Sequence, residues 1–241
     1  MEKVEPRRVF HFADGEVLLV DKPLRWTSFD VVSKIRNAIK PLKVKVGHAG
    51  TLDPLATGLL VICTGKFTKR IDSFQAEEKE YTGTITLGAT TPSYDLEQEI
   101  NERFDWSHIQ NDQIMQTAAS FVGEIDQIPP AHSAIKVDGE RVYEKARRGE
   151  SVEVKARRVH IYEFEITQIN LPEVNFRIVC SKGTYIRSLA HDFGRALNNG
   201  AHLSRLRRTK SGNFHVRDAW EIRDLVNCIK EFSLTTTHEN L

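Results

Sequence analysis

The sequence predicts one α+β domain with a mixed, largely antiparallel sheet flanked by helices. Three features of the 241 residues lead to this prediction. In several short segments apolar residues alternate with other residues, as they do in half-buried strands. In other segments they recur every three to four positions, as on the buried face of a helix. No internal repeat or low-complexity linker divides the chain.

Six segments have the composition of strands. Residues 16–20 (EVLLV) and 59–63 (LLVIC) are short apolar runs, which are typical of buried strands. Tyr81, Gly83, Ile85 and Leu87 alternate with other residues, as expected for a strand with one buried face. The strands we expect, in chain order, are 16–20, 43–46, 59–63, 81–87, 159–166 and 174–180.

Helical spacing marks four further segments. The first opens with Thr27-Ser28-Phe29-Asp30, which has the pattern of an N-terminal capping box with Asp in the usual Glu position. Its apolar residues are Phe29, Val32, Ile35 and Ile39. A second amphipathic helix, opened by Gly183-Thr184, has one face made of Ile186, Leu189, Ala190, Phe193 and Leu197. The expected helices are near 28–39, 111–121, 185–197 and 218–232.

The domain organisation follows from these elements. We expect residues 1–217 to form one domain and residues 218–241 to add a helix and a tail, without a separate C-terminal RNA-binding domain. Residues 124–150 contain Pro129-Pro130 and Gly149, which predict a protruding insertion and no second core.

Composition narrows the class of protein. No apolar run approaches the roughly 18 residues of a membrane span, and the charged N-terminus lacks the apolar stretch of a secretory signal. We therefore expect a soluble, cytoplasmic protein. Cys63, Cys180 and Cys228 are widely spaced and odd in number, so they predict buried thiols and neither a disulfide framework nor a zinc site.

Charge is segregated along a chain whose net charge is only +1. Residues 34–48 hold five basic residues and no acidic one, and residues 182–217 hold eight basic residues against Asp192. Acidic residues gather instead between 93 and 112. A basic face of this kind is typical of nucleic-acid binding, although a charged run is also the usual composition of a solvated surface.

The sequence lacks the motifs of several classes of enzyme. The segment LVICTGKF has neither the first glycine nor the final hydroxyl residue of a phosphate-binding loop. The sequence contains no GxGxxG, HExxH or GxSxG motif, and its nine histidines show no metal-ligand spacing.

The stretch GHAGTLDPLATG, residues 47–58, holds three glycines and a single carboxylate, Asp53. Pro54 disfavours the helical conformation for Asp53 and removes the next backbone donor. Two interpretations remain open on these residues alone. Asp53 caps its own turn, or the loop presents it as a nucleophile or proton shuttle that works beside a cation. Glycoside hydrolysis would normally need a second carboxylate.

Motifs along most of the chain resemble one family. GHAGTLDPLATG is preceded by LLVDKPLRWTSFDVV and followed by KEYTGTITLG, GEIDQIPPAHSAIKVDGERVYEKARRGE, CSKGTYIRSLAHDFG and GAHLSRLRRTKSG. In this order and spacing, across residues 16 to 214, the blocks are similar to those of the TruB family of tRNA pseudouridine synthases.

The resemblance implies the pseudouridine synthase fold and an isomerase that needs no cofactor and no metal. Members of the family convert uridine 55 in the T loop of tRNA to pseudouridine. Asp53 matches the essential aspartate, which attacks C1′, attacks the base or deprotonates the sugar. Arg187 matches the arginine that pairs with it.

Other positions match the family's substrate-binding residues. Tyr81 corresponds to the residue that stacks on the flipped uracil, and its hydroxyl is a candidate for moving the C5 proton. Tyr185 corresponds to a second pocket tyrosine, Leu206 to an apolar wall, and His48 to the histidine that fills the space left by the uridine.

The insertion at 124–150 resembles the family's thumb, a loop that folds over the T arm. The resemblance implies that Arg141, Lys145, Arg147 and Arg148 meet phosphates of the tRNA. We expect a monomer whose partner is tRNA. Two alternatives remain: an enzyme that depends on a guide RNA within a larger particle, and an RNA-binding folding factor in which catalysis is secondary.

Overall fold

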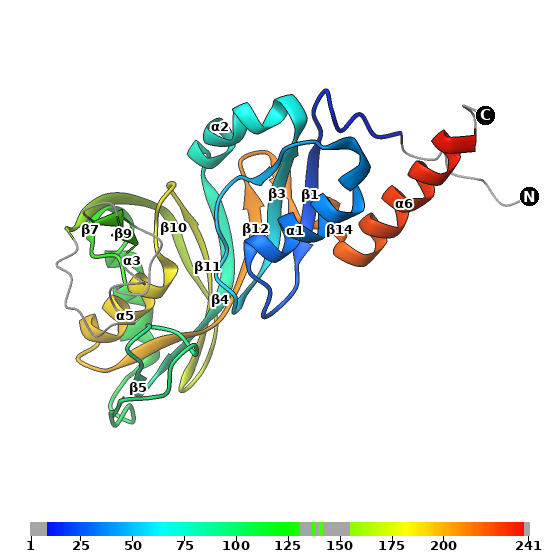
Figure 1. Ribbon diagram of the computed structural model, residues 1–241. Helices are drawn as coiled ribbons and strands as arrows, with labels where there is room; N and C mark the ends of the chain where they lie inside the picture. Colours follow the sequence, from blue (N-terminus) through cyan, green and yellow to red (C-terminus); the bar gives the residue numbers. More distant parts are fainter. Residues whose placement is uncertain (1–8, 131–135, 138–139, 142–154, 239–241) are drawn as a thin grey trace, which may run out of the picture. The chain divides into compact units, whose positions relative to one another are not determined.

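A computed structural model describes residues 9–130, 136–137, 140–141 and 155–238 (Figure 1). The chain forms two compact units, each with its own helices and strands. The first unit comprises Met1–Glu77 and Thr209–Leu241, and the second comprises Glu78–Arg208. The α+β class is confirmed. The expected domain boundary at residue 217, and the absence of a further RNA-binding domain, stay predictions.

Among the described residues, the first unit contains five whole strands of one sheet, β1, β2, β3, β13 and β14. β1 pairs with β3 in antiparallel and with β14 in parallel orientation, and β2 pairs in antiparallel orientation with the last residues of β3, Ile62 to Thr64. The elements of this unit are β1 (Val17–Lys22), α1 (Ser28–Ala38), η1 (Lys40–Leu42), β2 (Val46–His48), β3 (Ala56–Thr64), η2 (Gly65–Arg70), α2 (Ile71–Ala76), β13 (Phe214–His215), η3 (Val216–Asp218), β14 (Trp220–Glu221) and α6 (Ile222–His238).

Alternation along β1 and β3 gives this sheet two apolar faces. Leu18 and Val20 of β1, with Leu60 and Ile62 of β3, pack against the buried residues of α1 and α6. Figure 1 shows these two helices on the same side of the strands. The alternate residues Leu59 and Val61 join a second cluster on the opposite face, to which α2 contributes. The loop between β2 and β3 is therefore anchored at both ends in a packed core.

Helix α1 begins as predicted and buries Val32, Ile35 and Ile39 of the predicted apolar face, but not Phe29. Thr27 and Asp30 form the capping box, with Asp30 N donating to Thr27 Oγ1 over 3.0 Å and Thr27 N donating to Asp30 Oδ2 over 2.8 Å. The prediction that Phe29 faces the core is wrong, because its side chain is 61% exposed. Its ring lies 5.7 Å from the guanidinium of Arg36, which gives it a polar neighbour outside the core. Val31 is buried instead.

The predicted strand at 43–46 is also displaced. Lys43 has φ 49°, a left-handed conformation that ends η1, so pairing with β3 begins only at Val46. The strand runs on through His48, which shortens the loop expected at 47–58.

The second unit contains the longer strands. β4, β11, β10 and β7 are antiparallel neighbours in that order, and β12 lies beside β4. The elements are β4 (Lys79–Leu87), β5 (Ala89–Thr90), β6 (Glu102–Arg103), α3 (Asn111–Ser120), β7 (Gly123–Gln127), β8 (Lys136–Val137), β9 (Glu140–Arg141), β10 (Arg157–Asn170), β11 (Glu173–Cys180), α5 (Ile186–Ala196) and β12 (Ala201–Ser211), whose last residues belong to the first unit.

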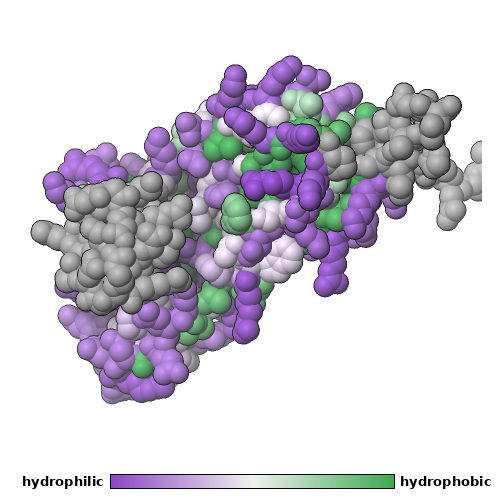
Figure 2. Space-filling view, in the orientation of Figure 1, coloured by the Kyte–Doolittle hydropathy of each residue, from purple (hydrophilic) through white to green (hydrophobic). Residues whose placement is uncertain are grey.

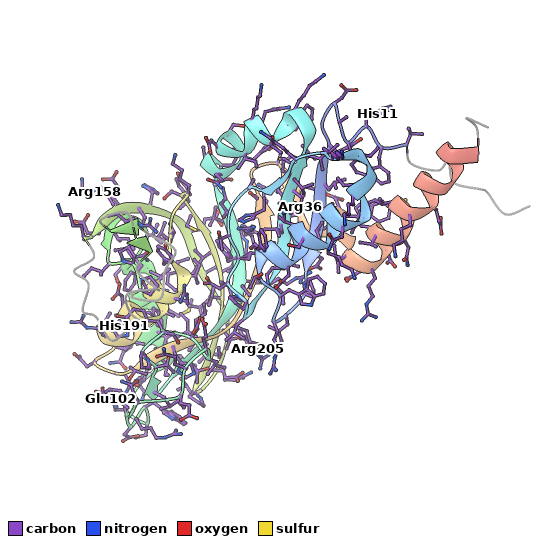
Figure 3. All side chains as sticks on the ribbon, in the orientation of Figure 1. His11, Arg36, Glu102, Arg158, His191 and Arg205 are labelled. Atoms are coloured by element: carbon purple, nitrogen blue, oxygen red, sulfur yellow. The ribbon has the colours of Figure 1, made fainter. Side chains whose placement is uncertain are left out.

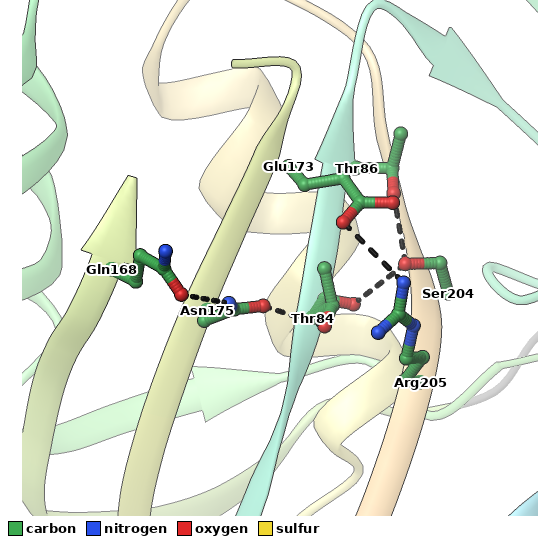
Figure 4. Close-up of polar contacts among 7 residues, drawn as sticks. All are labelled: Thr84, Thr86, Gln168, Glu173, Asn175, Ser204 and Arg205. Atoms are coloured by element: carbon green, nitrogen blue, oxygen red, sulfur yellow. Dashed lines mark hydrogen bonds and ion pairs between the residues drawn. The ribbon is translucent and has the colours of Figure 1, made fainter. Parts of the chain in front are cut away.

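Polar side chains cross this sheet from strand to strand. Asn175 of β11 donates to Gln168 of β10 over 3.2 Å and accepts from Thr84 of β4 over 2.7 Å. Thr86 donates to Ser204 of β12 over 2.8 Å, and Arg205 lies 3.5 Å from Glu173 (Figure 4). These pairs fix the register between neighbouring strands.

Helix α5 packs on the sheet by the face that its spacing predicts. Ile186, Leu189, Ala190, Phe193 and Leu197 are all buried, which confirms the predicted apolar stripe. Phe193 lies 5.6 Å from Phe164 of β10 between ring centroids, and Phe121 after α3 completes the aromatic cluster. This packing fixes the axis of the helix whose first turn carries Arg187.

Most of the predicted thumb falls outside the described residues. Arg141 lies on the two-residue strand β9, and nothing is described of its side chain. Lys145, Arg147 and Arg148 are not among the described residues. No described helix is both long enough and apolar enough to cross a bilayer.

The cysteines give a test of this packing. Burial raises the pKa of the Cys63 thiol to about 11 and that of Cys180 to about 12. Since the thiolate is the reactive form, we expect an aromatic disulfide reagent at pH 8 to label half-buried Cys228 first. Peptide mapping by mass spectrometry identifies the labelled site. In denaturant all three should react at similar rates, and rapid labelling of native Cys63 or Cys180 would contradict the core.

Candidate active site

Asp53 lies in the loop that joins β2 to β3. Ala56 N donates to Asp53 O over 3.0 Å, which closes a turn with Pro54 at its second position, where proline is favoured. His48, the last residue of β2, pairs with Ile62 and is half-buried. Asp53 itself is half-buried, so part of its surface stays accessible.

Two glycines let the loop reverse direction. Gly50 has φ 98° and Gly58 has φ 101°, backbone conformations that would be strained in a residue with a side chain. Just before Gly50, Ala49 N donates to Val61 O over 2.8 Å, so the chain is already bonded to β3 before it reaches Asp53. The glycines therefore shape the loop on both sides of the carboxylate.

Ser28 fixes the residue that precedes Asp53. Its buried hydroxyl accepts a hydrogen bond of 2.9 Å from Leu52 N and donates one of 3.2 Å to Leu52 O. Both backbone polar groups of Leu52 are thereby satisfied by one side chain from α1. The start of α1 and the loop thus hold each other in place.

Lys22 fixes the residue that follows Asp53. Its ammonium is fully buried at the end of β1 and donates to three carbonyl oxygens: Trp26 at 2.6 Å, Pro23 at 3.1 Å and Pro54 at 3.4 Å. Arg25 N also donates to Pro54 O over 2.7 Å. With Leu52 and Pro54 both bonded to other segments, the loop is a fixed support for Asp53.

A basic hollow of about 450 Å³ opens on the same unit. Arg36, Lys43 and Lys45 line it together with Val46 and Gly47, the residues that precede His48 in β2. Figure 3 shows Arg36 on α1. None of its lining residues is acidic. Within this unit the predicted basic segment 34–48 therefore forms a surface suited to an anion.

Arg187 lies in the first turn of α5 and is almost wholly buried, with 3% exposure. A cation at this position opposes the helix dipole, and no acidic residue in the first turn offsets it. Compensation comes from elsewhere in the second unit. Arg187 Nε lies 3.7 Å from Asp95 Oδ2, and Nη1 donates to Ser93 O over 3.4 Å.

The segment that carries Asp95 is itself fastened to α5 and β12. The Tyr94 ring stacks on His191 of α5 with centroids 4.1 Å apart, although Tyr94 has the unusual φ of 63°. Burial lowers the pKa of His191, which favours the neutral ring. Leu203 N donates to Tyr94 O over 2.9 Å, and Glu97 N donates to Asp95 Oδ1 over 3.0 Å. The carboxylate is thus held toward the arginine.

Asp95 differs from the other acidic residues of its region. Glu97, Glu99, Glu102 and Asp105 are exposed, and the surface around β5 is largely hydrophilic in Figure 2. Asp95 is only 5% exposed. The local charge pattern does not distinguish it from its neighbours, which is why the sequence did not single it out.

The two predicted tyrosines occupy different settings in the second unit. Tyr81 lies on β4 opposite Ile178 of β11 and is 9% exposed. Tyr185 is the N-cap residue of α5 and half-buried, and the Arg157 guanidinium lies 4.4 Å from its ring centroid. Leu206 is half-buried on β12.

The predicted site residues therefore divide between the units. His48 and Asp53 belong to the first, whereas Tyr81, Tyr185, Arg187 and Leu206 belong to the second. Within its unit Arg187 contacts Asp95, and its pairing with Asp53 stays a prediction. Lys22 and Ser28 were missed as supports, although both fall inside the motif LLVDKPLRWTSFDVV.

The basic segment at 182–217 needs a correction. Arg187 and Arg208 are buried, with 3% and 1% exposure, so they do not belong to an exposed basic face. Arg205 is exposed on β12, where it is labelled in Figure 3, but its guanidinium lies near Glu173. Part of this charge serves the interior of the protein.

Comparisons with known proteins agree with the motifs. The family model for the TruB family pseudouridylate synthase N-terminal domain matches residues 36–186, and that for the tRNA pseudouridylate synthase B C-terminal domain matches residues 187–238. The tRNA pseudouridine synthase B of Flavobacterium johnsoniae is 59% identical over 88% of this chain and 94% of the relative. That of Phocaeicola vulgatus is 55% identical over 88% of this chain and 92% of the relative.

Solved structures show the same fold. A chain of a Cbf5-Nop10-Gar1 complex superposes with a TM-score of 0.69 at 34% identity, over 90% of this chain and 55% of that chain. A chain of an H/ACA RNP bound to a substrate RNA containing 2'-deoxyuridine gives 0.66 at 31% identity, over 90% and 53%. This protein therefore spans about half the length of those chains. From its motifs, its fold and these matches, the chain belongs to the TruB family of pseudouridylate synthases.

Proposed function

We propose that this protein converts uridine 55 in the T loop of tRNA to pseudouridine. The relatives named tRNA pseudouridine synthase B, which are matched over nearly their whole length, support tRNA as the substrate. The observation that carries the proposal is the support of Asp53. A loop bonded on both sides of one partly accessible carboxylate is suited to chemistry that needs a single, accurately placed acid.

The reaction rearranges atoms without exchanging any with a cofactor. The N1–C1′ bond breaks, C5 bonds to C1′, C5 loses its hydrogen and N1 gains one, so substrate and product are isomers. In our proposal the ionised carboxylate of Asp53 attacks C1′, attacks the base or removes a proton from the sugar. In the same proposal the guanidinium of Arg187 stabilises the carboxylate.

The target uridine must leave the base stack before Asp53 can reach it. Aromatic rings stabilise an extruded base, each stacking contact contributing about 1–3 kcal/mol. In our proposal Tyr81 stacks on the uracil and moves the C5 proton, while Tyr185 and Leu206 complete the pocket. His48 fills the space that the uridine leaves in the RNA.

Binding of the T arm is assigned to basic side chains. The hollow lined by Arg36, Lys43 and Lys45 offers cations to the tRNA backbone. Phosphate contacts of this kind position RNA without reading its sequence. We assign the same role to Arg141, Arg147 and Arg148 of the thumb. In this proposal the protein acts as a monomer on tRNA in the cytoplasm.

The first test replaces the carboxylate while keeping its shape. With an unmodified tRNA transcript and no guide RNA, we expect wild-type protein to form one pseudouridine per tRNA at position 55. Asp53→Asn should lower the single-turnover rate by at least about a thousandfold, because the amide can act neither as nucleophile nor as base. Release of tritium from C5-labelled uridine gives the rate.

Asp72→Asn is the matched control for that variant. Asp72 lies exposed on α2 of the same unit, so its replacement should leave the rate unchanged. Activity of Asp53→Asn equal to this control would refute the assigned chemistry. An inactive wild type that gains activity only with a guide RNA would favour the guide-dependent alternative. Normal tRNA refolding by Asp53→Asn would add a separable folding function.

The second test removes a support and leaves the carboxylate in place. Ser28→Ala deprives buried Leu52 of both hydrogen bonds, a loss of about 1–3 kcal/mol. We expect the single-turnover rate to fall about tenfold, because small displacements of a catalytic group are costly, while the Kd for tRNA stays within about threefold.

Ser33→Ala on the same helix is the control for the helix propensity of the change. It should behave as wild type. Equal rates for Ser28→Ala and Ser33→Ala would show that the hydroxyl of Ser28 does not support the reaction.

A further inference from the structure

A buried glutamine joins the base of the thumb to the start of α5. Gln127 is the last residue of β7 and has no exposed surface. Its backbone pairs with Arg157 of β10, which places it at the sheet edge where the thumb leaves the described structure.

The side-chain amide of Gln127 forms hydrogen bonds to the backbone of Tyr185 through both of its polar atoms. Nε2 donates to Tyr185 O over 3.0 Å, and Tyr185 N donates to Oε1 over 2.7 Å. The amide thus pairs with the backbone of Tyr185 as a neighbouring peptide group would. Because Gln127 has no exposed surface, losing either bond would leave a polar atom of its buried amide unsatisfied.

A second bond joins the same two segments, one residue after Gln127 and three residues after Tyr185. Ser188 Oγ of α5 donates to Ile128 O over 2.7 Å. Tyr185 caps α5 without any side-chain bond of its own to the helix. Its carbonyl accepts from Leu189 N over 3.1 Å as well as from Gln127, and its N–H donates to Gln127, so the glutamine supplements the helical bond. Arg187 follows two residues later.

We propose that Gln127 is a positioning residue for pseudouridine formation. It fixes the peptide groups of Tyr185, and through them the Tyr185 ring and the Arg187 guanidinium, at the place where the thumb joins the sheet. This role rests on the function proposed above. It makes the geometry of the arginine dependent on one hydrogen-bonding amide that does not itself touch the substrate.

Gln127→Glu tests this role because its protonation state decides whether both bonds form. The neutral acid can donate to Tyr185 O and accept from Tyr185 N, as the amide does. The carboxylate has no proton to donate and sets a negative oxygen against a carbonyl. Burial favours the neutral acid and raises the pKa of such a group.

We therefore measure the single-turnover rate of each variant as a fraction of the wild-type rate between about pH 8 and about pH 5.5. For Gln127→Glu we expect the rate to be about tenfold below wild type at about pH 8. At about pH 5.5 we expect most of that difference to disappear. Gln127→Met has nearly the same shape and no hydrogen-bonding amide, so its fraction should stay low at every pH. Gln168→Glu is the same change at an exposed position of β10, and its rate should stay close to the wild-type rate at every pH.

Thermal melting and tRNA binding of every variant distinguish positioning from folding. The expected result is a pH-dependent rate for Gln127→Glu while the Kd for tRNA stays within about threefold of wild type. If the rate of Gln127→Glu relative to wild type does not change with pH, the proposal is overturned. It is also overturned if the rate of Gln127→Met falls only in proportion to its loss of folded protein. An active wild type with wild-type-like variants refutes this inference alone, whereas an inactive wild type refutes the proposed function and the inference with it.

Discussion

The ammonium group of Lys22 is the interaction on which the arrangement of the first unit depends. Removing an ammonium from water costs several kcal/mol, so a buried lysine is tolerated only where hydrogen bonds replace its hydration. Here the carbonyls of Pro23, Trp26 and Pro54 do so. They come from the end of β1, the segment before α1 and the loop that carries Asp53. One cation therefore ties three segments together, and displacement of any one of them would leave part of the charge unsolvated.

The second unit also contains a buried cation with polar partners, Arg187. The guanidinium is buried at the positive end of a helix, where Asp95 and Ser93 O compensate it. Gln127 then holds the backbone two residues before it. Both units thus surround a residue assigned to the chemistry with buried polar groups that come from distant parts of the chain. Such groups are costly when unpaired, so they favour a single arrangement of the site.

The local elements were predictable where a repeating pattern set them. Alternation along β4 and the apolar stripe of α5 were read correctly, as was the capping box at Thr27 and Asp30. Phe29 was misplaced because its helical spacing alone does not reveal that its ring stays exposed, with the Arg36 guanidinium beside it. The left-handed Lys43 shifted a strand start for a similar reason, since nothing in its side chain marks that conformation.

The residues of the Asp53 loop predict its turn, whereas the catalytic role of Asp53 was predicted only from the family resemblance. The supports of the loop escaped prediction because they act over long sequence separations. Ser28 binds a residue 24 positions away, and Lys22 binds one 32 positions away. Gln127 reaches across 58 positions. A single sequence does not reveal such pairs, although all three residues lie within the motifs that identify the family.

The central claim is that the support of Asp53 is complete before RNA binds, and amide hydrogen exchange in the free protein tests it most directly. The amides of Arg25, Leu52 and Ala56 report on the bonds to Pro54 O, Ser28 Oγ and Asp53 O. We predict that all three exchange at least about a thousandfold more slowly than in an unstructured peptide, an opening free energy of about 4 kcal/mol or more. Exchange at nearly the unstructured rate would show that the loop is assembled only on the substrate, and would contradict the claim.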